Sequence, residues 1–76
     1  MNGARIDQGD VERILRDVLN SQGVRVSMQR VDRTANGWRI IVTDSGGRVL
    51  TVDVPAGPAA AIRSALLHWT DTIDHA

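Results

Sequence analysis

The strongest constraint on the fold is the run of residues 37–44, Gly-Trp-Arg-Ile-Ile-Val-Thr-Asp, the densest concentration of β-branched and aromatic side chains in the chain. Residues of these types favour strands. Trp38, Ile40 and Val42 fall on one side, because successive side chains of a strand point to opposite faces. Other runs with strand character lie before and after, so we predict that residues 37–44 form the central strand of a sheet.

A tight hairpin is predicted to connect this strand to the next. Residues 44–48, Asp-Ser-Gly-Gly-Arg, supply three loop residues, the last being a glycine suited to the left-handed conformation. If Asp44 faces Arg48, the apolar sides of the two strands coincide without a slip in register. The predicted pairs are Val42 with Leu50, Ile40 with Val52 and Trp38 with Val54 on the apolar side, and Thr43 with Val49, Ile41 with Thr51 and Arg39 with Asp53, an ion pair, on the other.

The strand before the central one is predicted from alternation over residues 24–29, and we expect it to run antiparallel to residues 37–44. Its apolar side is expected to hold Val24, Val26 and Met28, and its polar side Arg25, Ser27 and Gln29. Val31 breaks the alternation, which predicts a bulge at that residue.

Helical periodicity marks both ends of the chain. The apolar residues at one helical spacing near the N-terminus are Val11, Ile14, Leu15, Val18 and Leu19. Asp7 is predicted to cap this helix together with Asp10, and Gly23 to end it. Charges four residues apart predict ion pairs of Glu12 with Arg16 and Arg13 with Asp17 on its outer face.

A second helix is predicted to begin at Pro58, whose missing N–H is harmless in a first turn. Its expected apolar stripe holds Ala59, Ile62, Leu66, Trp69 and Ile73, with Ala65 beside it. The chain is therefore predicted to be an α+β domain of order αβββα, a three-stranded antiparallel meander with both helices on one face. We expect one small domain over residues 1–76, with residues 1–6 and 74–76 as flexible tails.

Composition limits the classes of function. The 76 residues carry nine Arg, no Lys and nine acidic residues, so the net charge is zero, which is not the profile of a strongly basic nucleic-acid binder or a polybasic membrane surface. There is no Cys, no apolar run of membrane-spanning length, and no apolar signal region at the N-terminus. We expect a cytoplasmic protein that does not bind membranes.

No pattern typical of an active site stands out. His68 and His75 are the only histidines, too few for a zinc site of three or four ligands. Gly46-Gly47 joins two predicted strands, whereas a phosphate cradle leads from a strand into a helix. We therefore expect no enzyme activity, no catalytic or metal site, no cofactor and no small-molecule substrate.

The element order αβββα over residues 7–73 resembles that of the double-stranded-RNA-binding domain. The resemblance implies RNA contacts from the first helix, the loop between the first two strands and the start of the second helix. Where that family carries a lysine cluster at the second helix, this chain has Gly-Pro-Ala-Ala-Ala at residues 57–61. The loop between the first two predicted strands of this chain is Arg-Thr-Ala-Asn at residues 33–36. The candidate nucleic-acid contacts are Arg13, Arg16, Arg33 and Arg63.

The sheet face away from the helices offers the main candidate surface. Besides Arg25, Ser27 and Gln29 of the first strand, it is expected to present Arg39, Ile41, Thr43, Val49, Thr51 and Asp53, and these six are the candidate protein interface. The third strand is predicted to be a sheet edge that can accept another strand. The expected function is a protein-interaction domain that binds a partner protein or a second copy of itself, with nucleic-acid binding as the alternative; a merely solvated face remains open.

Overall fold

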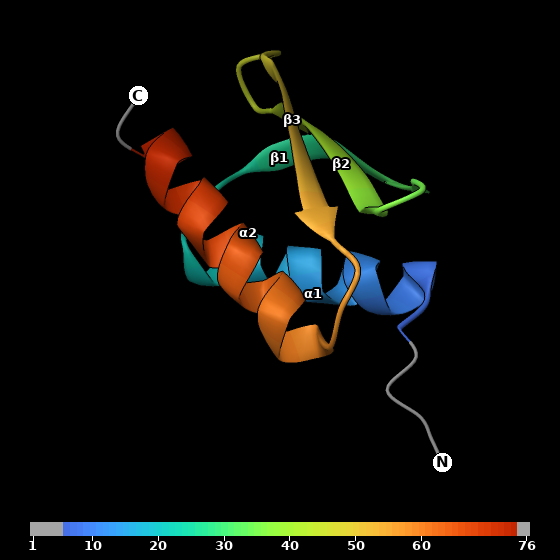
Figure 1. Ribbon diagram of the computed structural model, residues 1–76. Coiled ribbons are helices and arrows are strands. Elements are labelled where there is room, and N and C mark those ends of the chain that lie inside the picture. Colours follow the sequence, from blue (N-terminus) through green and yellow to red (C-terminus); the bar gives the residue numbers. More distant parts are fainter. Residues whose placement is uncertain (1–5, 75–76) are drawn as a thin grey trace.

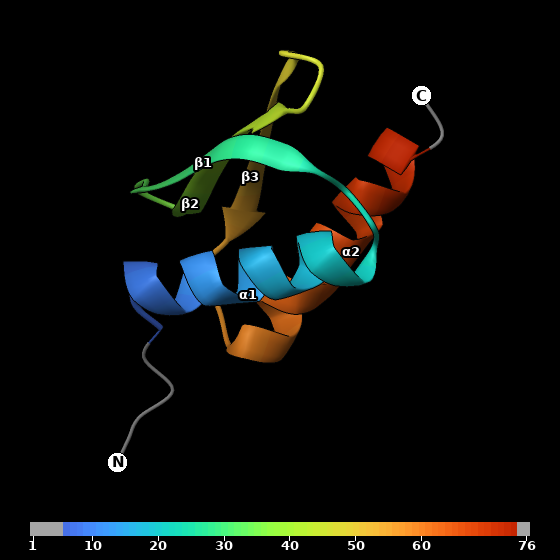
Figure 2. The same ribbon diagram turned by 180° about the vertical axis from the view of Figure 1, so that it is seen from behind.

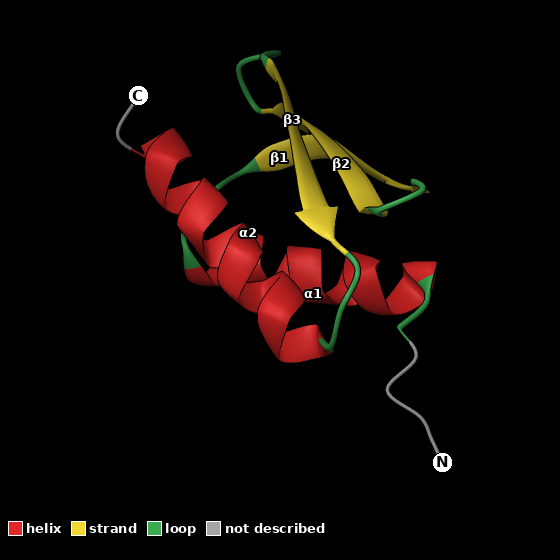
Figure 3. Cartoon of the chain, viewed as in Figure 1, coloured by secondary structure: helices red, strands yellow, loops and turns green. Residues whose placement is uncertain are grey.

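The chain forms two helices and three strands in the predicted order, as the computed structural model shows for residues 6–74 (Figures 1 and 3). The elements are α1 (Gln8–Ser21), β1 (Val26–Arg33), β2 (Gly37–Asp44), β3 (Val49–Pro55) and α2 (Ala59–Asp74). The strands form one antiparallel sheet of order β1-β2-β3, which confirms the α+β fold and places two strands at the edges.

Both helices lie on one side of the sheet. Opposite views place α1 next to α2, with α1 on the side of β1 and α2 on the side of β3 (Figures 1 and 2). Apolar side chains from all five elements fill the space between the two layers. The buried core comprises Val11, Ile14, Leu15, Val18, Leu19, Val31, Trp38, Ile40, Val42, Val54, Ile62 and Leu66. The other sheet face has no layer over it among residues 6–74.

Helix α1 begins and ends where the sequence predicts. The side chain of Asp7 accepts a hydrogen bond from the Asp10 N–H at 3.0 Å, and the Asp10 side chain accepts one from the Asp7 N–H at 3.2 Å. At the other end Gly23 has φ +70°, and the Val24 N–H donates to the Leu19 carbonyl at 2.9 Å. These bonds satisfy backbone groups that a helix end leaves free.

The register of β2 with β3 is the one computed from the hairpin. All six predicted pairs are present, and the pairing extends to Gly37 with Pro55. The Asp44 N–H donates to the Arg48 carbonyl at 2.9 Å, and Gly47 adopts φ +89°. Asp44 also accepts hydrogen bonds from the Gly46 and Arg48 N–H groups, each at 2.9 Å. These bonds hold the Asp44 carboxylate charged and lower its pKa, the Arg48 N–H contributing most.

The predicted facing of β1 is wrong from Ser27 onward. The irregularity lies between Val26 and Met28, not at Val31. The extra residue reverses which side chains point inward. Met28 is consequently 67 % exposed on the open face, whereas Val31 is 1 % exposed in the core.

The buried stripe of α2 is rotated from the predicted one. Ala59 is exposed, while Thr70 is fully buried and donates its hydroxyl to the Leu67 carbonyl at 3.0 Å. Trp69 is half-buried against the same core that contains Trp38. Thr70 can occupy a core position because its hydroxyl is satisfied by the hydrogen bond to the Leu67 carbonyl.

The predicted ion pair of Arg13 with Asp17 is replaced by one between the helices. Arg63 of α2 reaches Asp17 of α1 at 2.6 Å, and Glu12 accepts a hydrogen bond from Gln8. The structure thus connects charges that lie far apart in the sequence.

The predicted tails are mostly outside the described residues. Residues 1–5 and 75–76, including His75, are not described, nor is the side chain of Ile73. Ile6 is half-buried and packs against the core, and α2 extends to Asp74. Within residues 6–74, neither helix has the length and apolarity needed to cross a membrane.

Candidate functional site: the open sheet face and the β3 edge

All six candidate interface residues lie on the sheet face opposite the helices. The register aligns them in rows across β2 and β3: Thr43 with Val49, Ile41 with Thr51, and Arg39 with Asp53. β1 completes the rows with Met28, Arg30 and Asp32 in place of the predicted Arg25, Ser27 and Gln29. The broken alternation at Val31 was the sequence signal for these three residues, but it was interpreted as a bulge at Val31 instead of one before Met28.

One end of this face is a row of paired charges. Arg39 lies between Asp32 and Asp53 and donates to Asp53 at 3.0 Å, while Arg30 bonds Asp32 at 3.1 Å. The hydrogen bond with Asp53 raises the pKa of Arg39, and the same bond lowers the pKa of Asp53. Together with Arg30 of the neighbouring row, these residues make two arginines and two aspartates, so this end offers little net attraction to a charged partner.

The opposite end is apolar and exposed. Met28 and Val49 flank Thr43, and they are 67 % and 62 % exposed. Ile41 in the next row is half-buried. The face therefore changes from ionic to apolar toward the hairpin, and Val49 places the apolar end on the β3 edge.

The hydrogen-bonding pattern shows which groups of β3 point outward. The Asp44 N–H donates to the Arg48 carbonyl at 2.9 Å, and the Ala56 N–H donates to the Asn36 carbonyl at 3.1 Å. Each of these two residue pairs is therefore a hydrogen-bonded pair, one at each end of the β2–β3 ladder. Bonded and non-bonded pairs alternate along an antiparallel ladder. Leu50, Val52 and Val54 therefore bond to β2, whereas Val49, Thr51 and Asp53 direct both N–H and C=O away from the sheet. No residue among 6–74 covers these groups with a hydrogen bond outside the ladder.

The β1 edge is blocked by contrast. The same alternation leaves the Val31 carbonyl facing outward, and Gln8 of α1 donates to it at 2.9 Å. The bulge interrupts the edge at Ser27, whose hydroxyl donates to the Thr43 carbonyl at 3.3 Å. Bulges and covering groups are the usual devices that prevent strand addition. β3 has neither between Val49 and Asp53.

The four arginines proposed for nucleic acid lie on three elements, α1, β1 and α2. Arg63 is paired with Asp17. Arg16 lines a cavity with Arg25 beside Val24 and Val26, at the start of β1. Arg33 is at the other end of β1, and Arg13 is exposed on α1. Arg63 is thus neutralised, while the other three cations are placed on two different elements, α1 and β1.

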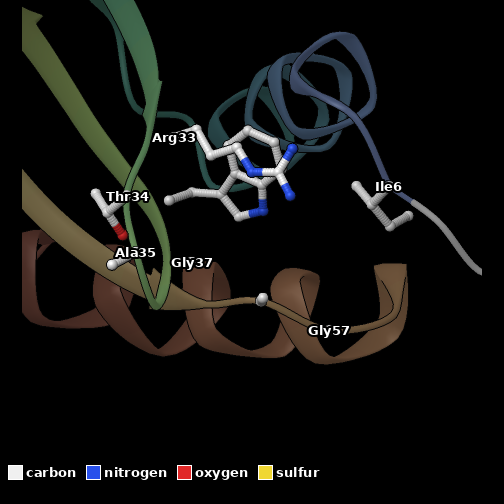
Figure 4. Close-up of a pocket in the computed structure, with 8 residues that line it drawn as sticks. Ile6, Arg33, Thr34, Ala35, Gly37 and Gly57 are labelled. Atoms are coloured by element: carbon white, nitrogen blue, oxygen red, sulfur yellow. The ribbon is translucent and has the colours of Figure 1, made fainter.

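Arg33 belongs to a cavity of about 240 Å³ between the β1–β2 loop and the segment that precedes α2. Its guanidinium carbon lies 5.7 Å from the centre of the Trp38 ring, a cation–π distance. Figure 4 shows the side chain extending across the cavity toward Ile6, with Gly57 on the opposite wall. No acidic side chain lines this cavity, and Arg33 has no ion-pair partner within residues 6–74.

The described side chains form no candidate metal site, since no three or more His, Asp or Glu among them are grouped closely enough to hold an ion. His68 is exposed on α2. Comparisons with protein-family models, curated proteins and solved structures give no match to this chain.

Proposed function

We propose that this chain is a non-enzymatic protein-interaction domain that binds an extended segment of another polypeptide at the β3 edge. The observation that carries the proposal is the set of outward N–H and C=O groups at Val49, Thr51 and Asp53, which no residue among 6–74 covers. An added strand bonds to such groups through its main chain, which gives affinity without requiring a deep pocket.

The side chains around this edge support the same mode of binding. Val49 is 62 % exposed, and Leu50 and Val52 are only half-buried although they pack against the core. An added strand would cover apolar surface on both faces of the sheet, which favours association. Asp53 is the one charged residue on this strand and is neutralised by Arg39. We keep the cytoplasm as the proposed location, because a chain without Cys needs no oxidising compartment.

A strand-forming probe peptide tests the proposal directly. A seven-residue peptide of alternating valine and threonine, titrated into the isotope-labelled chain, is expected to shift the amide resonances of Val49, Thr51 and Asp53. A control peptide with proline at every second position lacks the required N–H groups and should cause no shift. In a chain that light scattering shows to be monomeric, unchanged β3 amides at millimolar peptide would reject strand addition at this edge.

Nucleic-acid binding is the second candidate, favoured by the unpaired Arg33 over Trp38. Duplex RNA or DNA would then produce salt-sensitive shifts at Arg33 and Arg63, lost in Arg33→Ala and Arg63→Ala. Shifts there, with none in β3, would replace the proposed function by this one.

A further inference from the structure

We propose that the strand bound at this edge is β3 of a second copy, antiparallel to the first and with Thr51 on the two-fold axis. This inference rests on the proposed function and names its partner. The two sheets would then form one continuous sheet across the axis, a symmetric arrangement in which the same surface serves both copies.

The register follows from which residues can bond. Pairing Thr51 with Thr51 of the second copy places Val49 opposite Asp53 at both ends. Val49, Thr51 and Asp53 of one copy then meet Asp53, Thr51 and Val49 of the other, and each of these pairs can exchange two backbone hydrogen bonds.

Shifting the register of the two β3 strands by two residues in either direction loses backbone hydrogen bonds between the copies. Toward the hairpin, Asp53 would face Gly47, whose N–H already donates to the Asp44 carbonyl at 3.0 Å. Toward the other end, Val49 would face Pro55, which has no N–H. A further slip would bring the two Asp53 side chains directly opposite each other, and like charges in that position are destabilising. The register centred on Thr51 avoids all three conditions.

The side chains agree with this register. On the helix side of the sheet, Leu50 would lie opposite Val52 of the other copy, so two half-buried apolar residues would cover each other. On the open side, Thr51 meets Thr51, and the two Asp53 residues are kept apart, each still paired with its own Arg39.

Helix α2 lies beside the β3 edge, on the helix side of the sheet. Arg63 lies on the side of α2 that faces α1, because it pairs with Asp17. At 100° per residue, Ala65 and Trp69 lie on the other side of the buried stripe, and both are half-buried. β3 and α2 appear together on one side of the molecule (Figure 1), so the exposed part of Trp69 should become less accessible when two copies associate.

Single-cysteine variants test both the association and its register, because the chain has no Cys of its own. Directly opposed residues in a bonded antiparallel pair have Cα atoms about 5.5 Å apart. Their Cβ atoms lie too far apart for an unstrained disulfide but within reach of a short thiol-specific crosslinker. Thr51→Cys is therefore expected to form a covalent dimer with such a crosslinker. Val49→Cys alone should not, since the two copies of residue 49 would be roughly 13 Å apart, but Val49→Cys mixed with Asp53→Cys should.

Solution mass provides the second measurement. At high concentration, light scattering should give about twice the 8.3 kDa of one chain. Thr51→Lys places two like charges on the axis and should weaken dimerisation at least about tenfold. Met28→Lys, the same charge change on the exposed face of β1, is the matched control and should leave the dimer intact.

The outcomes separate this inference from the proposed function. A strictly monomeric chain whose β3 amides still respond to the valine–threonine peptide would reject the second copy as partner and keep strand addition. Crosslinking through Met28→Cys instead of Thr51→Cys would reject the β3 register in favour of the open face. A monomer that also ignores the peptide would reject both.

Discussion

The two edge strands of this sheet, β1 and β3, differ in whether their outward-facing backbone groups are covered. At β1, the Val31 carbonyl is bonded by Gln8, and a bulge at Ser27 interrupts the strand. At β3, Val49, Thr51 and Asp53 are paired regularly with β2, and nothing among residues 6–74 covers their outward groups. The first residue of α1, Gln8, covers β1, whereas β3 has no such contact between the hairpin that precedes it and Pro55 at its end. Protection of a sheet edge is therefore a local property, set by a few contacts.

The largest expected effect is on the attachment of β3 to the sheet. A Cβ at Gly37 would overlap the Val54 carbonyl oxygen and lie 2.6 Å from the Ala56 nitrogen, both backbone atoms that cannot move without displacing β3. Gly37→Ala is expected to destabilise the fold by at least about 3 kcal/mol, measured by urea unfolding.

Gly46→Ala is the matched control for that substitution, because a Cβ there meets only the Asp44 side chain at 3.4 Å and φ is not positive. It should change stability by less than about 0.5 kcal/mol. Equal effects of the two substitutions would show that β3 is not held closely at Gly37.

Equivalent truncations on the two edge strands should differ in cost. Val31 is buried, so Val31→Ala is expected to destabilise by about 2 kcal/mol. Val52 is half-buried, and Val52→Ala should cost about 1 kcal/mol at low protein concentration.

The effects of these two truncations should diverge further when protein concentration is raised. Association stabilises the folded state by mass action, so the cost of Val52→Ala should increase with concentration while that of Val31→Ala stays constant. A concentration-independent difference would contradict burial of Val52 between two copies.

Removing the group that covers β1 should have a moderate effect. Gln8→Ala leaves the Val31 carbonyl without its side-chain donor and is expected to cost about 1 kcal/mol. Gln8→Met keeps the length of the side chain without a donor, so a similar loss would assign the effect to the hydrogen bond. Because the bulge remains, neither variant should change the mass of the protein in solution; larger assemblies would show that Gln8 alone protects this edge.

Acid should loosen β3 by a smaller amount. The pKa values of Asp44 and Asp53 are lowered from 3.8 by hydrogen bonds to Arg48 and Arg39. A carboxyl group with a depressed pKa in the folded state adds stability above its unfolded value, and that stability is lost as the pH falls through the folded value. The melting temperature should therefore decline between about pH 5 and pH 3, and Asp53→Asn should show a shallower decline. An unchanged slope in Asp53→Asn would remove the Arg39 pair from this dependence.

The sequence predicted those parts of the fold and site that depend on neighbouring residues. Asp7 and Gly23 end α1 as expected, and the β2–β3 register followed from the length of the hairpin and its last glycine. The six-residue interface group was placed on one face for the same reason, since a fixed register fixes every side chain on both strands.

Contacts between distant residues were beyond the sequence. The place of the bulge depends on how β1 pairs with β2, so the prediction of a bulge at Val31 was right about an irregularity in β1 and wrong about its position. Likewise, the sequence predicted Arg13 as the ion-pair partner of Asp17, but the packing of α2 against α1 brings Arg63 to that carboxylate instead.

The two amphipathic helices, the meander and the apolar side of its hairpin follow from local sequence, because periodicity, capping and turn geometry act over a few residues. That β1 is covered and β3 is open follows instead from how the helices pack on the sheet. That difference depends on Gln8 reaching Val31 across 23 positions and on a one-residue bulge, and both arise when the helix layer and the sheet come together.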